Sequence, residues 1–283
     1  MMLNDEWRYK GMEWKNVYRG LLMGASDVIP GVSGGTIALL LGIYDQLIAS
    51  INGLMTKEWN KQFGFLIPLG IGVATSILLF SKVIDWLLKH YPGPLQFFFL
   101  GLIIGILPKL FQEADARNTF QFKHYALLLL GIVFIGMIAV LNVSEVSIIE
   151  SRSLRTYAFL FAAGFLGSAA MILPGISGSM ILLVIGAYYT VIHAVSHLHL
   201  DVLAVVGAGI VMGIVVMSKV INYFLTHYQK GTYALVIGFV IGSLAIVFPG
   251  WPSEKTGVML CVVTFAFGLL IAYILGKVEY EES

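Results

Sequence analysis

Two short phrases of similar sequence carry the residues best suited to chemistry in this chain. Residues 30–44 read PGVSGGTIALLLGIY and residues 174–188 read PGISGSMILLVIGAY, with eight of the fifteen positions identical. Proline and glycine break a helix, and the residues that follow begin a new helix whose first N–H groups have no partners. Such a helix N-terminus attracts anions, so each phrase predicts a site for a phosphate or a carboxylate.

Seven residues of the two phrases are predicted to bind this anion, because glycines let the backbone approach a ligand and hydroxyls donate to its oxygens. They are Ser33, Gly34, Gly35 and Thr36 in the first phrase, and Ser177, Gly178 and Ser179 in the second. In the alternative interpretation, the glycines only permit close helix crossing and the serines only cap helices. The breaks are predicted at Pro30-Gly31 and at Pro174-Gly175. Two matching breaks in apolar segments are typical of a transporter binding site.

Four charged residues lie in or beside apolar segments. Lys82 and Lys219 occupy equivalent repeat positions, and each is predicted to attract an anion at one mouth of a pathway. The alternative is snorkelling to the membrane surface, or for Lys82 a pair with Asp85. Asp27, the acid nearest to a break, predicts proton or cation coupling, unless it only caps or braces the turn. Arg19 is predicted to meet an anionic head group or to anchor the inner end of its segment.

The composition is that of a membrane protein. The 283 residues are 58% hydrophobic and 12% charged, with a mean hydropathy of +0.89, whereas soluble domains carry roughly 25% charged residues. A net charge of +1 gives no electrostatic case for a nucleic acid partner. The single cysteine, Cys261, excludes an internal disulfide. We expect no cofactor.

Ten apolar segments divide into two halves of five. Their ranges are 16–29, 32–51, 65–89, 94–111 and 124–143, then 156–173, 176–195, 201–225, 232–249 and 257–276. The segment before the first break is too short to cross a bilayer, so we predict a re-entrant hairpin over 16–51 and, by the repeat, another over 156–195. The alternative is a pair of kinked spanning helices.

The predicted fold is an all-α, polytopic integral membrane protein. Three single crossings follow each hairpin, and because three is odd the second half is inverted relative to the first. The repeats are predicted over 1–143 and 156–278. Placing the N-terminus inside puts eleven of the 17 Lys and Arg residues on the inner side and four on the outer side. Both termini are therefore expected in the bacterial cytoplasm. We expect membrane lipids as neighbours, and a homo-oligomer stays open.

Other classes of protein fit less well. The phrase G-x-S-G also surrounds the serine of intramembrane proteases, which makes a hydrolase using Ser33 the alternative from another class, yet all six histidines lie near segment ends. No acid ring or carbonyl filter marks a channel. His193, His197, His199 and Asp201 have a spacing that could bind zinc, but no second ligand cluster supports it, so we expect no metal site.

The two phrases, read at greater length, resemble a known family. GLLMGASDVIPGVSGGTIALLLGIYDQLI at 20–48 and AMILPGISGSMILLVIGAYY at 170–189 resemble the PopT family, formerly domain of unknown function 368, and the resemblance covers nearly the whole chain. It implies a flippase-type transporter of polyprenyl phosphate, in bacteria undecaprenyl phosphate, that recycles the lipid carrier for peptidoglycan and other envelope polymers. Another anion is the alternative substrate. The resemblance implies no roles for particular residues.

Overall fold

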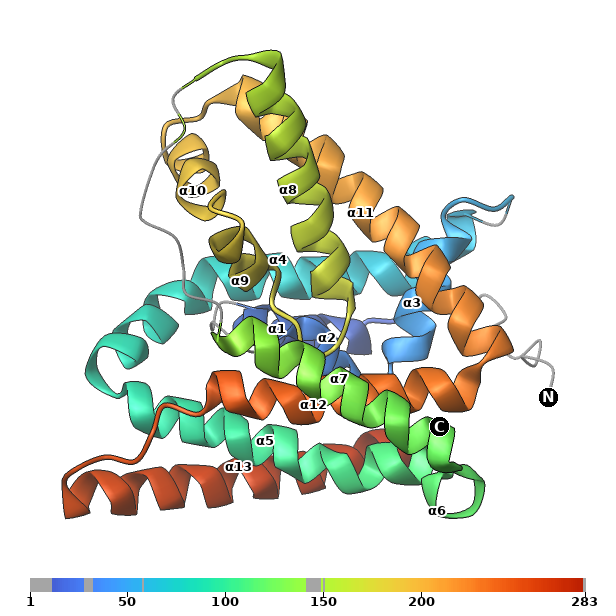
Figure 1. Ribbon diagram of the computed structural model, residues 1–283, viewed down its shortest axis with the longest axis vertical. Coiled ribbons are helices and arrows are strands. Elements are labelled where there is room, and N and C mark those ends of the chain that lie inside the picture. The colour runs from blue at the N-terminus through green and yellow to red at the C-terminus, as the bar shows by residue number, and fades with distance from the viewer. Residues whose placement is uncertain (1–11, 28–32, 58, 141–148, 150, 282–283) are drawn as a thin grey trace.

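The structure is a computed structural model that describes residues 12–27, 33–57, 59–140, 149 and 151–281 (Figure 1). Helices are the regular structure throughout that part. Those of the first half are α1 (Lys15–Asp27), α2 (Gly34–Leu40), α3 (Tyr44–Gly53), α4 (Trp59–His90), α5 (Pro92–Glu113), α6 (Ala116–Thr119) and α7 (Phe122–Val140). Those of the second half are α8 (Leu154–Ile172), α9 (Gly178–Val184), α10 (Tyr188–Ser196), α11 (Leu200–His227), α12 (Gln229–Val247) and α13 (Lys255–Glu281).

The predicted all-α, polytopic fold is confirmed. The described residues include six helices long and apolar enough to cross a membrane, or up to eight spans if each of two bent helix pairs counts as one. Many large apolar side chains on their outer faces are exposed, such as Leu78 at 76% and Met259 at 71%. Such faces suit a bilayer, where apolar surface meets lipid rather than water.

Both returning arms of the expected hairpins bend a second time. The segment expected over 32–51 is two helices, α2 and α3, that differ in direction by 118°, and the segment over 176–195 is α9 and α10, which differ by 116°. Gly42 and Gly186 occupy these bends with φ of 64° and 78°, a backbone conformation that side chains with a Cβ rarely adopt. The two arms are therefore short helices joined by a tight turn rather than single helices.

Close helix pairs are built on glycine. In the pair of α5 and α13, a Cβ on Gly101 would clash with the Phe265 carbonyl, and one on Gly268 with the Phe98 carbonyl. In the pair of α7 and α12, a Cβ on Gly238 would clash with the Leu128 carbonyl. A Cβ on Gly131 would lie 2.7 Å from Leu235 O. Adding 137 to the residue numbers Gly101, Phe98 and Gly131 gives Gly238, Leu235 and Gly268, so the two pairs use equivalent residues.

The pairs of α1 with α4 and of α8 with α11 correspond likewise. Gly20 and Gly72 bring α1 and α4 together, and their equivalents Gly164 and Gly209 bring α8 and α11 together. Ser76 of α4 donates its hydroxyl to Leu21 O at 2.7 Å, and Ser168 of α8 donates to Ile210 O at 3.0 Å. The glycine equivalences agree with two related halves, although the two serines are not equivalent to each other. The repeat boundaries and the inverted topology stay predictions.

The two bent helix pairs are packed very differently. Every residue of α2 is buried, and the pair of α2 and α3 contacts α5, α8, α11 and α13 as well as α1 and α4. In contrast α9 has no buried residue, and the pair of α9 and α10 packs mainly against α8 and α11. Figure 1 shows α8, α9, α10 and α11 as a group that projects away from the stack of α5, α7, α12 and α13. The second pair is therefore loosely docked where the first is buried.

The glycine contacts lead to a prediction about stability. Gly101→Ala is expected to lower the free energy of unfolding by about 1–3 kcal/mol, because the new methyl group would force α5 away from α13. Gly136→Ala in α7 is the matched control, since nothing lies within 4 Å of an added Cβ there. Thermal unfolding in detergent measures both variants. Equal melting temperatures would show that α5 and α13 do not pack as closely as described.

Candidate binding site at the two helix breaks

The two breaks lie against each other. The backbone N–H of Gly175 donates a hydrogen bond of 2.9 Å to Oγ1 of Thr36, and both residues are buried. A Cβ added to Gly35 would lie 3.4 Å from Ile172 O and 3.4 Å from the Cα of Pro174. The hydroxyl of Tyr44 donates to Ile172 O at 3.1 Å. The structure thus brings Thr36 and Gly35 of the first phrase next to Pro174 and Gly175 of the second.

The N-terminus of α2 already holds an anionic group of the protein itself. Ser33 caps this helix in the ordinary way, because its Oγ accepts a hydrogen bond of 3.1 Å from the N–H of Gly35. The carboxylate of Asp27, at the end of α1, accepts a hydrogen bond of 2.6 Å from the N–H of Gly34. Asp27 therefore occupies the position in which an external anion would meet α2.

The N-terminus of α9 lacks such an acid. Ser177 makes no capping hydrogen bond to the backbone, and its hydroxyl instead lies 2.8 Å from that of Ser179. Met171 takes the place that Asp27 has in the first half, and a Cβ added to Gly178 would lie 3.3 Å from the Met171 Cβ. Gly175 has φ of 83°, and any Cβ there would lie 2.6 Å from Phe239 O, so this break requires glycine.

The other predicted residues are not joined to these helix ends by the described contacts. Arg19 is half-buried and donates to Asn16 Oδ1 at 2.9 Å, two turns or about 12 Å along α1 from Asp27. Lys219 is exposed on α11. Lys82 belongs to α4, but its side chain lies outside the described residues, as do Pro30 and Gly31.

Four contacts that the sequence analysis missed dock the first bent pair onto the second half. Besides Tyr44 and Thr36, Tyr233 of α12 donates to Asp45 Oδ2 at 3.1 Å. The Asn52 amide donates to Ser218 O of α11 at 2.8 Å. Polar residues in the apolar segment 32–51, and Asn52 directly after it, were the available signal, because a polar group in such a segment needs a partner. Their partners could not be read from the sequence, since they lie more than one hundred residues away.

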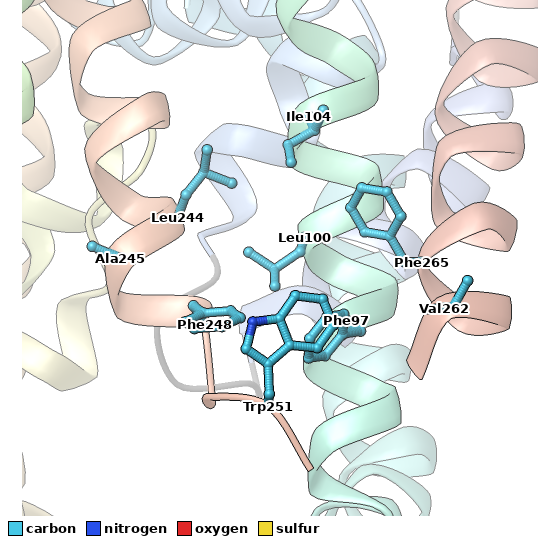
Figure 2. Close-up of a pocket in the computed structure, with 9 residues that line it drawn as sticks. All are labelled: Phe97, Leu100, Ile104, Leu244, Ala245, Phe248, Trp251, Val262 and Phe265. Carbon is cyan, nitrogen blue, oxygen red and sulfur yellow. The ribbon is translucent and has the colours of Figure 1, made fainter. Parts of the chain in front are cut away.

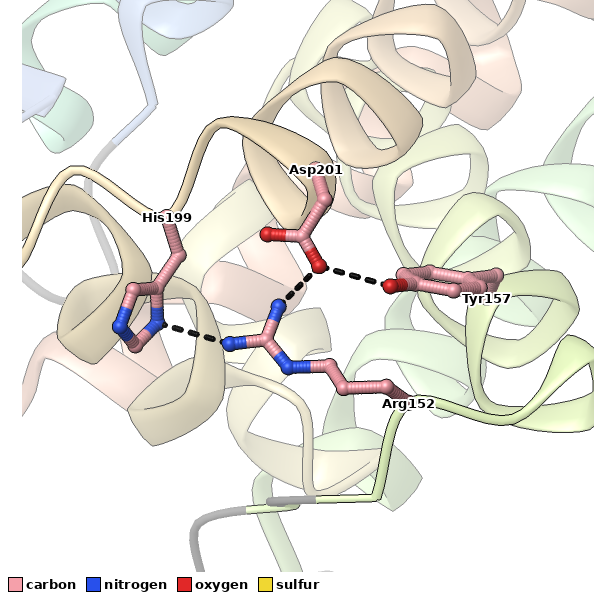
Figure 3. Close-up of polar contacts among 4 residues, drawn as sticks. All are labelled: Arg152, Tyr157, His199 and Asp201. Atoms are coloured by element: carbon pink, nitrogen blue, oxygen red, sulfur yellow. Dashed lines mark hydrogen bonds and ion pairs between the residues drawn. The ribbon is translucent and has the colours of Figure 1, made fainter.

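A polar cluster braces the projecting group at the start of α8 and α11, away from the breaks (Figure 3). Arg152 forms an ion pair with Asp201, the Tyr157 hydroxyl donates to Asp201 at 2.7 Å, and Arg152 also contacts Nδ1 of His199 at 3.1 Å. The hydrogen bond to Asp201 raises the pKa of Arg152. The rings of His193 and His197 stack with centroids 4.1 Å apart. Within the described residues, no three His, Cys, Asp or Glu side chains are arranged to hold a metal ion.

The chain is a multi-pass α-helical membrane protein in which two helix breaks, one from each half of the sequence, lie against each other. The chain belongs to the undecaprenyl phosphate translocase-like family, whose sequence model matches residues 23–261. It is 43% identical over 279 residues to the polyprenyl-phosphate transporter of Staphylococcus aureus, covering 96% of this chain and 99% of the relative. It is 37% identical over 261 residues to the polyprenyl-phosphate transporter of Vibrio cholerae, covering 87% of this chain and 80% of the relative. No solved structure matches the chain.

Proposed function

We propose that this chain is a flippase-type transporter that returns undecaprenyl phosphate from the outer to the inner leaflet of the bacterial cytoplasmic membrane. The near full-length similarity to two polyprenyl-phosphate transporters carries the proposal. Transport would make the lipid carrier available again at the inner leaflet for the synthesis of peptidoglycan and related polymers. The meeting of two helix breaks supports a site for the phosphate head, while the isoprenoid tail stays in apolar surroundings.

The phosphate head is proposed to bind between the two breaks. Ser177, Gly178 and Ser179 would bind it first, because no acid competes at the start of α9. The ligands from the first half, Ser33, Gly34, Gly35 and Thr36, would join once Asp27 leaves the N–H of Gly34. Two negative groups cannot share one helix N-terminus without strong repulsion. Phosphate binding and the displacement or protonation of Asp27 are therefore coupled, which gives Asp27 its proposed coupling role.

Positive charge is proposed to guide the head group to this site. With both termini in the cytoplasm, Lys82 lies nearer the outer face and Lys219 nearer the inner face, so each would serve one mouth. The exposure of Lys219 suits contact with a lipid phosphate at the membrane surface. Arg19, at the inner end of α1, would meet the head group as it leaves.

Transport is proposed to exchange the packing of the two bent helix pairs. If the halves are inverted repeats, the state with α2 and α3 docked has a counterpart in which α9 and α10 are docked. The repeat offsets of 144 and 137 make Tyr189 the equivalent of Asp45 and Gln96 the equivalent of Tyr233. Tyr189 and Gln96 can form the same kind of polar contact as Asp45 and Tyr233. The loose packing of α9 supports this exchange.

The exposure of undecaprenyl phosphate on intact cells tests the proposed function. Cells lacking the protein are expected to bind more of an external antibiotic that recognises this phosphate lipid, and restoring the protein should reverse the effect. The cells must lack any second recycling transporter. An unchanged level of outer exposure would overturn the proposal.

Ser33→Ala separates transport from hydrolysis. The variant is expected to keep transporting, at a stability cost of about 0.5–2 kcal/mol for the lost helix cap, because backbone N–H groups still bind the phosphate. A serine nucleophile would instead be lost with its hydroxyl. Complete loss of function in a well-folded Ser33→Ala protein, together with a hydrolysed product in the wild type, would favour the hydrolase.

A further inference from the structure

An apolar groove opens between α5, α12 and α13 at the end of the molecule where α12 leads into α13. The space within this open groove is about 470 Å³. It is lined by Phe97, Leu100, Ile104, Leu244, Ala245, Phe248, Trp251, Val262 and Phe265. Figure 2 shows the indole of Trp251 rising from the connecting loop, beside Phe97 and Phe248. All nine side chains are apolar or aromatic, and no charged group lines the groove.

Three aromatic rings form the end of this groove nearest the loop. The ring centroids of Phe97 and Trp251 are 5.3 Å apart, those of Phe97 and Phe248 are 5.9 Å apart, and those of Phe248 and Trp251 are 6.1 Å apart. The rings meet edge-on or tilted rather than stacked face to face, an arrangement that aromatic rings prefer. Trp251 and Phe248 are 66% and 43% exposed, so this end of the groove is accessible from outside the protein.

The corresponding place in the other half is closed. The offset of 137 makes Ala234 the equivalent of Phe97 and Ala114 the equivalent of Trp251, so two of the three rings are missing there. Ala234 and Ile237, the equivalent of Leu100, are both 0% exposed. The groove is thus a feature of one end of the molecule. By the distribution of Lys and Arg, that end faces outward.

The groove also adjoins the helix that packs against the first break. On its other side, α5 places Phe99, Ile103 and Ile106 against Thr36 and Ile37 of α2. One helix therefore separates the groove from the residues proposed to hold the phosphate. A lipid whose head reaches the breaks from the outer leaflet would have its chain beside α5.

We infer that this groove binds the part of the isoprenoid tail nearest the phosphate, as the lipid is collected from the outer leaflet; the inference rests on the proposed function. Apolar chains gain no hydrophobic free energy on leaving lipid for a protein groove, so selection there depends on van der Waals packing and hence on shape. A branched, unsaturated chain differs from a straight acyl chain in just this respect. The groove is accordingly a specificity site for polyprenyl over alkyl chains.

The test uses the purified full chain in vesicles with polyprenyl phosphate that carries a photoreactive group on its first isoprene units. The label is expected on residues of the groove, and a saturated alkyl phosphate of equal length should not compete for it. Labelling spread over all lipid-facing helices, or equal competition by the alkyl phosphate, would overturn the inference. This readout measures binding alone, so it gives an answer even if the chain proves to transport nothing.

A matched pair of variants adds a functional readout. Ala245→Trp fills the groove from an exposed position, and Ala266→Trp places the same side chain on an exposed face of α13 outside the cavity. Ala245→Trp is expected to reduce groove labelling and polyprenyl phosphate transport by ~10-fold, about 1.4 kcal/mol. Ala266→Trp should change neither. Equal labelling and equal transport in the two variants would overturn the inference that the groove binds the tail. Absence of transport in the wild type would instead contradict the proposed function.

Discussion

Replacing Asp27 by asparagine is expected to reduce polyprenyl phosphate transport by about tenfold or more while leaving the protein folded. The carboxylate of Asp27 accepts a hydrogen bond from the N–H of Gly34 at 2.6 Å. In the proposed mechanism it holds the N-terminus of α2 until phosphate arrives. Asparagine can accept the same hydrogen bond, because Asn and Asp cap helices about equally well. It carries no charge and takes up no proton, so it cannot couple its release to the binding of phosphate.

The measurement compares transport with stability in the same preparation. Loss of the charge near a helix N-terminus should cost less than about 1 kcal/mol, so the melting temperature in detergent should change little. Asp115→Asn is the control, because Asp115 begins the short helix α6 with φ of 45°, a conformation that asparagine also tolerates. Transport by Asp27→Asn equal to that of Asp115→Asn would show that Asp27 only braces the turn.

Cross-linking either bent helix pair in its docked position is expected to stop transport almost completely. In a Cys261→Ala chain, cysteines at 45 and 233 replace a contact seen in the structure, between Asp45 and Tyr233. Cysteines at 96 and 189 replace the contact proposed for the opposite state, between Gln96 and Tyr189. A short bifunctional thiol reagent should join each pair in part of the population. A carrier held in one state cannot expose its site to both faces of the membrane.

A third cysteine pair supplies the control for cross-linking itself. Arg152, just before α8, forms an ion pair with Asp201 of α11 within the projecting group, so linking cysteines at these positions should leave transport nearly unchanged (Figure 3). Failure of the 96 and 189 pair to react, while the 45 and 233 pair reacts, would contradict the exchange of docked pairs. It would leave the family and the head-group site untouched.

Most of the spanning helices could be predicted because long apolar runs and their Pro and Gly breakers decide where a helix can exist in lipid. Spanning segments expected at 94–111 and 232–249 are the helices Pro92–Glu113 and Gln229–Val247. The second bend in each returning arm was missed, although Gly42 and Gly186 are identical in the two phrases and each precedes a tyrosine by two residues. A lone glycine in an apolar run can mark either a turn or a close contact between helices. Only its positive φ in the structure shows that it lies in a turn.

The chemistry of the site was predictable in kind but not in arrangement. The repeated Ser-Gly pattern pointed to two helix N-termini, and both exist, at Gly34 and Gly178. That Asp27 folds back onto one of them depends on the path of the chain between α1 and α2. The unequal burial of α2 and α9 could not be foreseen either, because the two phrases are similar and the difference arises from contacts with distant helices. Packing of this kind, like the groove beside α5, belongs to tertiary structure.

Transport by the purified protein is the measurement to make first. The protein would be reconstituted in vesicles with a fluorescent polyprenyl phosphate, and the fraction of label accessible to a membrane-impermeant quencher would be followed with time. We expect protein-dependent equilibration between leaflets that unlabelled polyprenyl phosphate inhibits and that the Asp27→Asn variant largely lacks. Equilibration no faster than in protein-free vesicles, with a folded wild-type protein in both possible orientations, would contradict it.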